Sequence, residues 1–169
     1  MHRLGNLFLG FLSHIYVKLN THSSYQNNPS VPIMSAPSTR EPKHVVMVVD
    51  DREDDLYYAS VILQKTCSDC DVRTYLNSEQ ALEDLRTRGH EVDLVLLDVV
   101  MPAMNGLEFL RAYADLQQQG RAHAKVAVHS AFGDLPEVSA AMSHPSVAHF
   151  VEKPMSRDTV RALHDLLAR

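Results

Sequence analysis

The stretch LLDVVMPAMNG, residues 96–106, places an aspartate directly behind a run of apolar residues. The apolar run that ends at Leu97 is typical of a buried β-strand, and the Met-Pro and Asn-Gly pairs behind Asp98 are turn signals. A carboxylate at the end of a buried strand costs free energy unless it is solvated, paired or bound to a metal. Asp98 is therefore either a polar residue at an ordinary strand end or a functional carboxylate.

On both sides of this stretch, short apolar runs alternate with segments of helical periodicity. We predict strands over residues 44–49, 71–76, 93–97, 125–129 and 147–151. A helix is predicted after each strand, with apolar residues at Leu56, Ala59 and Leu63, at Ala81, Leu82 and Leu85, at Leu107, Leu110 and Ala114, near 135–143, and, from Ser156 on, at Val160, Leu163 and Leu167. Five strands alternating with five helices predict an α/β fold, in which helices cover both faces of a parallel sheet.

The net charge of −5 is unevenly distributed along the chain. Residues 1–43 carry a charge of +3, whereas residues 44–169 carry −8. An acidic domain without a basic run is not typical of proteins that bind nucleic acid directly. We therefore expect no direct nucleic-acid partner.

Residues 1–43 differ in composition from the rest of the chain. The apolar segment 4–17 is shorter than the ~20 residues that span a bilayer, and no small-residue cleavage site of a signal peptide follows it. Its helical stripe leaves a membrane-surface helix open as an alternative, although we expect no membrane association. The Pro/Ser-rich residues behind it are typical of an unstructured linker. We predict a disordered extension over 1–43, with Met34 as a possible true start, and one domain over 44–169.

Cys67 and Cys70 are the two cysteines of the chain. A redox-active pair with this spacing opens a helix directly after a strand, whereas this pair lies between a predicted helix and the next strand. A structural zinc site needs about four ligands, and none of the ten histidines lies at ligand spacing beside the pair. We expect two reduced thiols without a functional role in a cytoplasmic protein.

Polar side chains stand at the ends of four predicted strands. They are Asp50 and Asp51, Asp98, Ser130, and Glu152 with Lys153. In an open parallel sheet, ligands bind beyond the carboxyl ends of the strands, so these side chains are expected to meet at one edge. Clustered carboxylates suit Mg²⁺, which prefers to share its ligand shell with a phosphoryl group. One aspartate can then attack phosphorus, while a lysine and a serine hydroxyl bind the phosphoryl oxygens.

With these residues in place, the segment 44–169 resembles the receiver domain of two-component response regulators, in particular the stand-alone, chemotaxis-regulator-like kind. The matching residues are Asp50-Asp51, Asp98 with MPAMNG behind it, Ser130-Ala131 and Lys153-Pro154. The resemblance implies a flavodoxin-like, doubly wound, five-stranded parallel sheet with strand order 2-1-3-4-5 and five helices. It covers all of the chain after residue 43.

The resemblance also implies a role for each matching carboxylate. Asp98 would be the phosphoacceptor. Asp51 and Asp98, together with the backbone carbonyl of Val100, would bind Mg²⁺, and Asp50 would contact the ion through a water molecule.

The remaining site residues implied by the resemblance lie on the last two strands. Lys153 would bind the phosphoryl group, ahead of a cis bond to Pro154. Ser130 and Phe150 would form the switch that reports phosphorylation. The sequence departs from the commoner family pattern in three respects: Phe150 lacks a hydroxyl, Ser130 stands in place of a threonine, and both Val100 and Phe132 beside the site are apolar.

The function implied is that of a single-domain response regulator rather than an enzyme. It would accept a phosphoryl group from a sensor histidine kinase or a histidine phosphotransfer protein in a Mg²⁺-dependent reaction. Because the last predicted helix reaches the C-terminus, the output is expected to be phosphorylation-dependent binding of a downstream protein target.

Two other classes were weighed against this interpretation. An aspartate-based phosphatase-like enzyme would carry its nucleophile after the first strand with a second acid two residues on, where this chain has Arg52. A flavodoxin needs a hydroxyl-rich phosphate loop after that strand, whereas the run DDREDD, residues 50–55, would repel a phosphate.

Overall fold

Strands and helices alternate throughout residues 44–167, the part of the chain that this computed structural model describes. The predicted extension over 1–43 and the possible start at Met34 lie outside the described residues. The elements are β1 His44–Val49, α2 Glu53–Thr66, β2 Cys70–Tyr75, α3 Ser78–Arg88, β3 Leu94–Leu97, α4 Gly106–Gln118, β4 Lys125–Ser130, α5 Pro136–Met142, β5 Val147–Glu152 and α6 Arg157–Leu167. All ten predicted elements are present, and the predicted strand ends differ from the observed ones by at most one residue.

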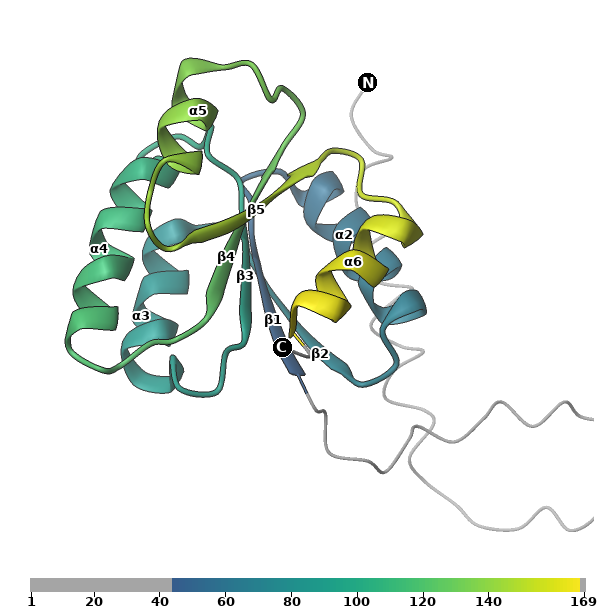
Figure 1. Cartoon of the computed structure of the whole chain (residues 1–169), viewed down its shortest axis with the longest axis horizontal. Helices are drawn as coiled ribbons and strands as arrows, with labels where there is room; N and C mark the ends of the chain where they lie inside the picture. Colours follow the sequence, from purple (N-terminus) through teal and green to yellow (C-terminus); the bar gives the residue numbers. More distant parts are fainter. Residues whose placement is uncertain (1–43, 168–169) are drawn as a thin grey trace, which may run out of the picture. The chain divides into compact units, whose positions relative to one another are not determined.

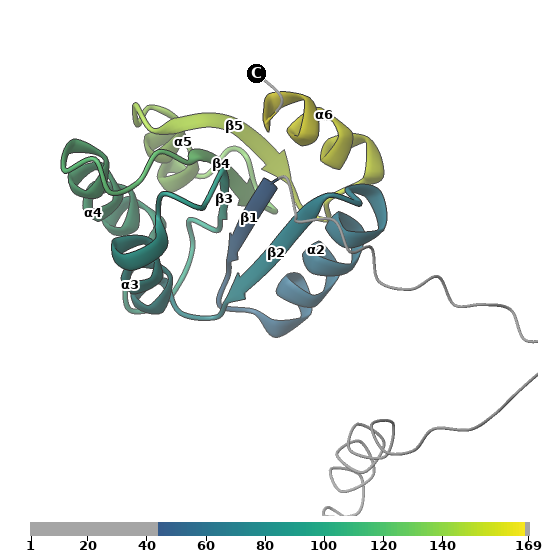
Figure 2. The ribbon, with the colours of Figure 1, turned by 90° about the horizontal axis from the view of Figure 1, so that it is seen from below.

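The five strands form one parallel sheet in the order β2-β1-β3-β4-β5, which confirms the predicted fold. Helices α2 and α6 cover one face of the sheet, and α3, α4 and α5 cover the other (Figures 1 and 2). The reversal of strand order falls between β1 and β3, which pair directly, so the carboxyl ends of these two strands lie side by side. This is where an open parallel sheet binds its ligands.

Each face of the sheet has its own hydrophobic core. The β1 and β3 side chains are buried along their whole length, as a parallel sheet covered on both faces requires. On the α3–α4–α5 face, the largest buried side chains are Phe109 and Tyr113, both inaccessible to solvent. Burying one such ring contributes roughly 1.5–3 kcal/mol.

The buried face of α4 differs from the prediction. We expected the stripe Leu107, Leu110 and Ala114, but Leu107 and Ala114 are only half-buried. The side chains that fill the core from this helix are Phe109, Leu110, Tyr113 and Leu116. The aromatic pair, four residues apart on one side of the helix, therefore sets which side faces the sheet.

The loop that follows Asp98 is fixed where it enters α4. The Asn105 side chain accepts a hydrogen bond from the Glu108 amide, and the Glu108 carboxylate accepts one from the Asn105 amide, which forms a capping box. A Cβ on Gly106 would lie 2.6 Å from the Cα of Val99, so only glycine allows the helix start to pack this closely behind the strand end.

The cysteine prediction is wrong. Cys67 and Cys70 form a disulfide rather than two reduced thiols. The short turn between α2 and β2 brings their Cα atoms to 5.5 Å, which lies within the usual range for a bridged pair. Among residues 44–167, no helix is long and apolar enough to cross a membrane.

Candidate functional site at the carboxyl edge of the sheet

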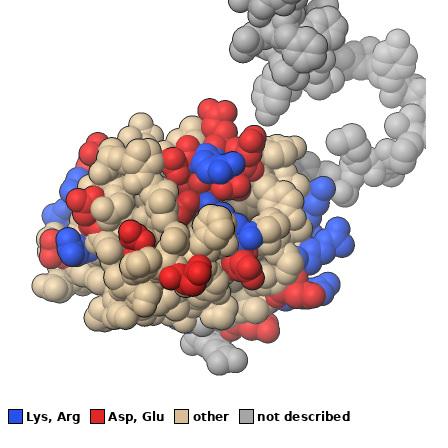
Figure 3. All heavy atoms as spheres, turned by 90° about the horizontal axis from the view of Figure 1, so that it is seen from above, with Lys and Arg blue, Asp and Glu red and all other residues tan. Residues whose placement is uncertain are grey.

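The first two carboxylates of the site stand at the ends of β1 and β3. The strands pair with Val49 opposite Leu97, so Asp50 and Asp98 leave the sheet side by side. The Asp98 amide donates a hydrogen bond of 2.9 Å to the Val49 carbonyl, which holds the two strand ends together. Figure 3 shows the molecule from above Figure 1, the side toward which β1 runs, where acidic side chains gather around basic ones.

Three aspartates supply oxygen atoms at this edge. One carboxylate oxygen each from Asp50, Asp51 and Asp98 lies within 4.8 Å of the others. Asp50 is fully buried and Asp98 nearly so. Three converging carboxylates form an all-oxygen donor set, which fits a hard divalent cation such as Mg²⁺.

Lys153 places its ammonium group among these carboxylates. Its Nζ lies 2.6 Å from Asp50 Oδ2 and 2.7 Å from Asp98 Oδ2. The Lys153 amide donates a hydrogen bond of 2.9 Å to the Ser130 carbonyl, which fixes the end of β5 against β4. The Lys153–Pro154 peptide bond is cis, as the resemblance implied. The structure thus brings the lysine and the predicted carboxylates into one cluster.

Burial and charge shift the pKa values of this cluster. Burial raises the pKa of Asp50 above its usual range, and the hydrogen bond and charge of Lys153 oppose that rise. For Lys153, burial lowers the pKa, but the hydrogen bonds and charges of Asp50 and Asp98 outweigh burial and raise it above its usual range. Lys153 therefore remains a cation at neutral pH, and it partly offsets the repulsion between the carboxylates.

Asp55 is a fourth carboxylate of the cluster, and the sequence analysis did not single it out. Its Oδ2 lies 3.1 Å from Lys153 Nζ and 3.5 Å from Arg52 Nε. Asp55 belongs to the first turn of α2, where the helix dipole favours a negative charge. The acidic run at 50–55 could have indicated Asp55 as a member of the cluster, because a helix that begins at Glu53 keeps Asp55 at the same edge of the sheet.

Ser130 and Phe150 lie on the strands next to the cluster. Ser130 is buried at the end of β4, and its Oγ accepts a hydrogen bond of 3.4 Å from the Phe132 amide. Phe150 is half-buried on β5, and its Cζ lies 3.3 Å from where a Cβ on Gly133 would be. The ring therefore lies against the loop that follows Ser130, and the switch role of both residues stays a prediction.

Val100 and Phe132 expose large apolar side chains beside the cluster. Val100 is 54% exposed, and its amide donates a hydrogen bond of 2.9 Å to Asp98 Oδ1. Phe132 is 64% exposed, two residues beyond Ser130. Exposed side chains of this size contribute little to folding, and the predicted effect of Val100 and Phe132 on the site stays a prediction. The predicted role of the Val100 carbonyl as a metal ligand stays a prediction.

His129 is a buried titratable group that the sequence analysis missed. It precedes Ser130 in β4, is 3% exposed, and neither ring nitrogen has a hydrogen-bond partner among the described residues. Burial, followed by the positive charge of Lys153, lowers its pKa from 6.5 to about 4. His129 is therefore neutral at physiological pH, next to a lysine that is charged.

We expect His129 to make the fold sensitive to acid. Between pH 6.5 and about pH 4 the histidine of the unfolded chain binds a proton that the folded chain excludes, so the free energy of unfolding falls as the pH is lowered. The full loss is about 3 kcal/mol, because one pKa unit corresponds to about 1.4 kcal/mol. Urea unfolding at pH 7.5 and 4.5 should show His129→Leu losing less stability than the native chain. The exposed His149→Gln serves as the control, and equal losses in all three proteins would contradict the expectation.

Comparisons with known proteins show which sequences and folds this chain resembles. The sequence matches the family described as "Response regulator receiver domain" over residues 46–165. It is 28% identical over 118 residues to sporulation initiation phosphotransferase F of Bacillus subtilis, covering 69% of this chain and 86% of that protein. Chemotaxis protein CheY4 of Vibrio cholerae aligns with a TM-score of 0.59 at 22% identity, over 73% of this chain and 98% of that one. A CheX-CheY-BeF3-Mg²⁺ complex from Borrelia burgdorferi aligns with a TM-score of 0.60 at 22% identity, over 74% of this chain and 87% of that one.

Proposed function

Because the chain belongs to the response regulator receiver domain family, we propose that Asp98 is the aspartate on which it accepts a phosphoryl group. The observation that carries the proposal is the convergence of Lys153 Nζ, at 2.7 Å, on a nearly buried Asp98 carboxylate beside Asp50. The chain is thus a phosphorylation-dependent signalling protein, and the comparisons do not support the alternative of a phosphatase-like enzyme. Loss of the phosphoryl group by hydrolysis at the same site is compatible with that function.

The chain's own residues hold the acceptor in place. The Val100 amide binds Asp98 Oδ1 and the Lys153 ammonium binds Oδ2, so the carboxylate is fixed before a donor arrives. In the transfer step, an Asp98 oxygen attacks the phosphorus of a phosphohistidine, the P–N bond breaks, and the imidazole nitrogen keeps the electron pair and takes up a proton. Lys153 then pairs with the phosphoryl oxygens, and positioning of this kind is a large part of phosphoryl-transfer catalysis.

We propose that Asp51 and Asp98 bind Mg²⁺ with the Val100 carbonyl, and that Asp50 contacts the ion through water. Receiver domains as a family bind this ion, and the oxygen cluster described above supports the same site here. When bound, Mg²⁺ offsets the negative charge between the carboxylates and the incoming phosphoryl group. The test is incubation with a small acyl phosphate: one phosphoryl group should be added per chain by intact mass, and a chelator should prevent it. Labelling that is unaffected by the chelator would contradict the metal requirement.

The proposed partners follow from the same chemistry. A sensor histidine kinase or a histidine phosphotransfer protein would supply the phosphoryl group, in the cytoplasm where the kinase binds ATP. The output would be binding of a downstream protein to the surface of β4, α5, β5 and α6. Phe150 supports this proposal, because its ring connects β5 to the loop that follows Ser130. Movement of Ser130 toward a phosphoryl group would therefore change the conformation of that surface.

We expect the acyl phosphate on Asp98 to decay slowly. Hydrolysis needs a water molecule aligned with the phosphorus, and neither Val100 nor Phe132 can hold one by a hydrogen bond. Val100→Asn combined with Phe132→Ala should speed the decay roughly tenfold, which corresponds to about 1.4 kcal/mol of barrier. The measurement is loss of label over time by intact mass, with Tyr57→Ala, an exposed residue of α2, as the control. An unchanged decay rate with normal Mg²⁺ binding would exclude a role for the pair.

We also propose that residues 44–169 form the receiver domain by themselves. The change of composition at His44 and the family match over 46–165 support this boundary. A chain that begins at Met34 should equal the full chain in melting temperature and in labelling rate. Since about 1 kcal/mol moves the melting temperature of a domain of this size by a few degrees, a loss of several degrees would show that residues 1–33 contribute to the fold.

A further inference from the structure

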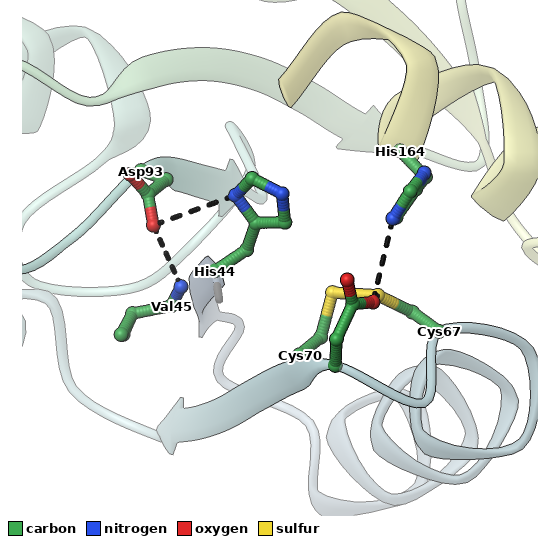
Figure 4. The surroundings of a disulfide bond; sticks show 7 residues. His44, Val45, Cys67, Cys70, Asp93 and His164 are labelled. Carbon is green, nitrogen blue, oxygen red and sulfur yellow. Dashed lines mark hydrogen bonds and ion pairs between the residues drawn. A yellow bond between two sulfur atoms is a disulfide. The ribbon is translucent and has the colours of Figure 1, made fainter. Parts of the chain in front are cut away.

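A second cluster of metal-ligating side chains lies at the opposite edge of the sheet. His44 begins β1, Asp69 directly precedes β2, and His164 belongs to the last turn of α6. One ligand atom from each of the three lies within 4.8 Å of the others, and His164 Nε2 is 3.4 Å from Asp69 Oδ1. The two imidazole rings meet edge to face, with centroids 5.7 Å apart. Residues far apart in the sequence thus bring two imidazoles and a carboxylate to one place (Figure 4).

His44 is oriented like a histidine that binds a metal ion. Its side chain is 9% exposed, and Nε2 is buried without a hydrogen-bond partner in the described part of the chain. On the other side of the ring, Nδ1 faces Asp93 Oδ2 at 3.9 Å, and the Val45 amide holds that oxygen with a hydrogen bond of 2.8 Å (Figure 4). A carboxylate behind one ring nitrogen commonly orients a histidine that binds metal with the other.

An ordinary ion pair does not account for this cluster. The pair between His164 and Asp69 is more than one-third exposed, and surface pairs of this kind contribute little to stability. Such a pair also leaves the buried Nε2 of His44 unsatisfied, which is unfavourable in any fold without a ligand. A metal ion would satisfy that nitrogen.

The disulfide lies against the same carboxylate. Cys67 Sγ is 3.3 Å from Asp69 Oδ1, and this is a contact rather than a hydrogen bond because a disulfide sulfur carries no hydrogen. One ligand atom each from Cys67, Asp69 and Cys70 also lies within 4.8 Å of the others. Asp69 Oδ1 therefore lies close to both the His164 imidazole and the Cys67 sulfur. A pocket lined by Cys67, Asp69 and His164 connects the cluster with solvent.

We propose that His44, Asp69 and His164 bind a divalent transition metal ion of the zinc class, and that a thiolate of Cys67 or Cys70 joins them as the fourth ligand when the disulfide is reduced. Two imidazoles and a carboxylate provide three of the four ligands that zinc prefers, and a thiolate is a favourable fourth. In the reduction, two small thiols give up two electrons and two protons and become a disulfide, while the cysteines become thiols. The thiol that binds the metal releases its proton.

The proposed zinc site is separate from the phosphorylation site. β1 runs from His44 to Val49, so the two edges of the sheet lie about 20 Å apart at ~3.3 Å per residue. The ion would connect α6 to the starts of β1 and β2, and it should therefore raise the melting temperature without supporting phosphorylation.

The test is a zinc titration of the full, untagged chain by calorimetry, with the disulfide intact and after reduction. We expect the oxidised chain to bind one zinc ion that is lost or weakened at least tenfold in His164→Gln and in Asp69→Asn. The exposed His123→Gln is the matched control and should bind zinc like the native chain. His2, His14 and His22 are present in every variant, so differences between variants report the proposed site.

Reduction supplies the second readout. Reduced chain should bind zinc at least tenfold more tightly than oxidised chain, and Co²⁺ in its place should show a thiolate-to-metal charge-transfer band that His164→Gln weakens. Equal zinc affinity in His164→Gln and His123→Gln would overturn the proposal. Binding by the reduced chain that depends on the cysteines alone would overturn it too. The half-exposed His164 allows these tests even where the buried His44→Gln does not fold.

Discussion

Replacing Asp98 by asparagine is expected to abolish phosphorylation of the chain by a small acyl phosphate and Mg²⁺. The amide is nearly the same size as the carboxylate, but it is not a nucleophile toward phosphorus and it contributes no negative charge to the cation site. The hydrogen bond from the Val100 amide can still be accepted, so the fold should be kept. The measurement is intact mass after incubation, where the native chain gains one phosphoryl group and the variant gains none.

The matched control for this prediction is Asp115→Asn, on the exposed side of α4. It removes the same charge from the protein and should label at the native rate. Label that persists in Asp98→Asn at the native level would place the acceptor elsewhere. Label that appears slowly and maps to a neighbouring carboxylate of the cluster, such as Asp51, would show that the site tolerates a substitute acceptor.

Lys153→Met is expected to destabilise the fold by about 3–5 kcal/mol, because it leaves buried carboxylates without their cation. The Lys153 side chain is 10% exposed, and it faces Asp50 Oδ2 at 2.6 Å with that side chain 1% exposed. Without the ammonium group, the repulsion between Asp50 and Asp98 is unopposed at neutral pH. In thermal unfolding, a loss of this size lowers the melting temperature of a domain of about this length by on the order of 10 °C.

Two further variants make the Lys153 prediction specific. Lys65→Met removes an exposed lysine near the end of α2 and should change the melting temperature little. Lys153→Met combined with Asp50→Asn should regain part of the lost stability, because the second change removes one of the two buried negative charges that repel each other. If Lys153→Met is as stable as Lys65→Met, solvation by water rather than the charge of Lys153 stabilises the carboxylates of the cluster.

Much of the fold follows from local patterns in the sequence. Apolar runs such as HVVMVV and DLVLL report strands buried on both faces, because only a covered parallel sheet tolerates them without alternation. The Met-Pro and Asn-Gly turn signals behind Asp98 indicate that the strand ends there, and the apolar residues that follow indicate a helix. The strand order came from the family resemblance rather than from these patterns, since a hydrophobic run does not indicate its neighbour in the sheet.

Most of the carboxyl-edge cluster could also be predicted, because Asp50, Asp98 and Lys153 each follow a strand directly. In a parallel sheet all carboxyl ends reach the same edge, so sequence position alone brings Asp50, Asp98 and Lys153 together. Asp55 was not predicted, because it lies in the first turn of α2 and the direction of its side chain depends on the residue at which that helix begins. His129 was not predicted either, because the burial of a strand residue depends on which elements pack against the strand.

What only the tertiary structure decided lies at the other edge of the sheet. His44 and His164 meet because α6 packs against α2 and shares a hydrophobic core with β1, the first strand of the domain. Cys67 and Cys70 lie at bonding distance because the turn after α2 folds back toward β2, which contradicted the expectation from their spacing. Local patterns determine which elements form and which side of each is apolar. Distances between residues on different elements depend on how those elements dock, and that is set by the packing of the whole domain.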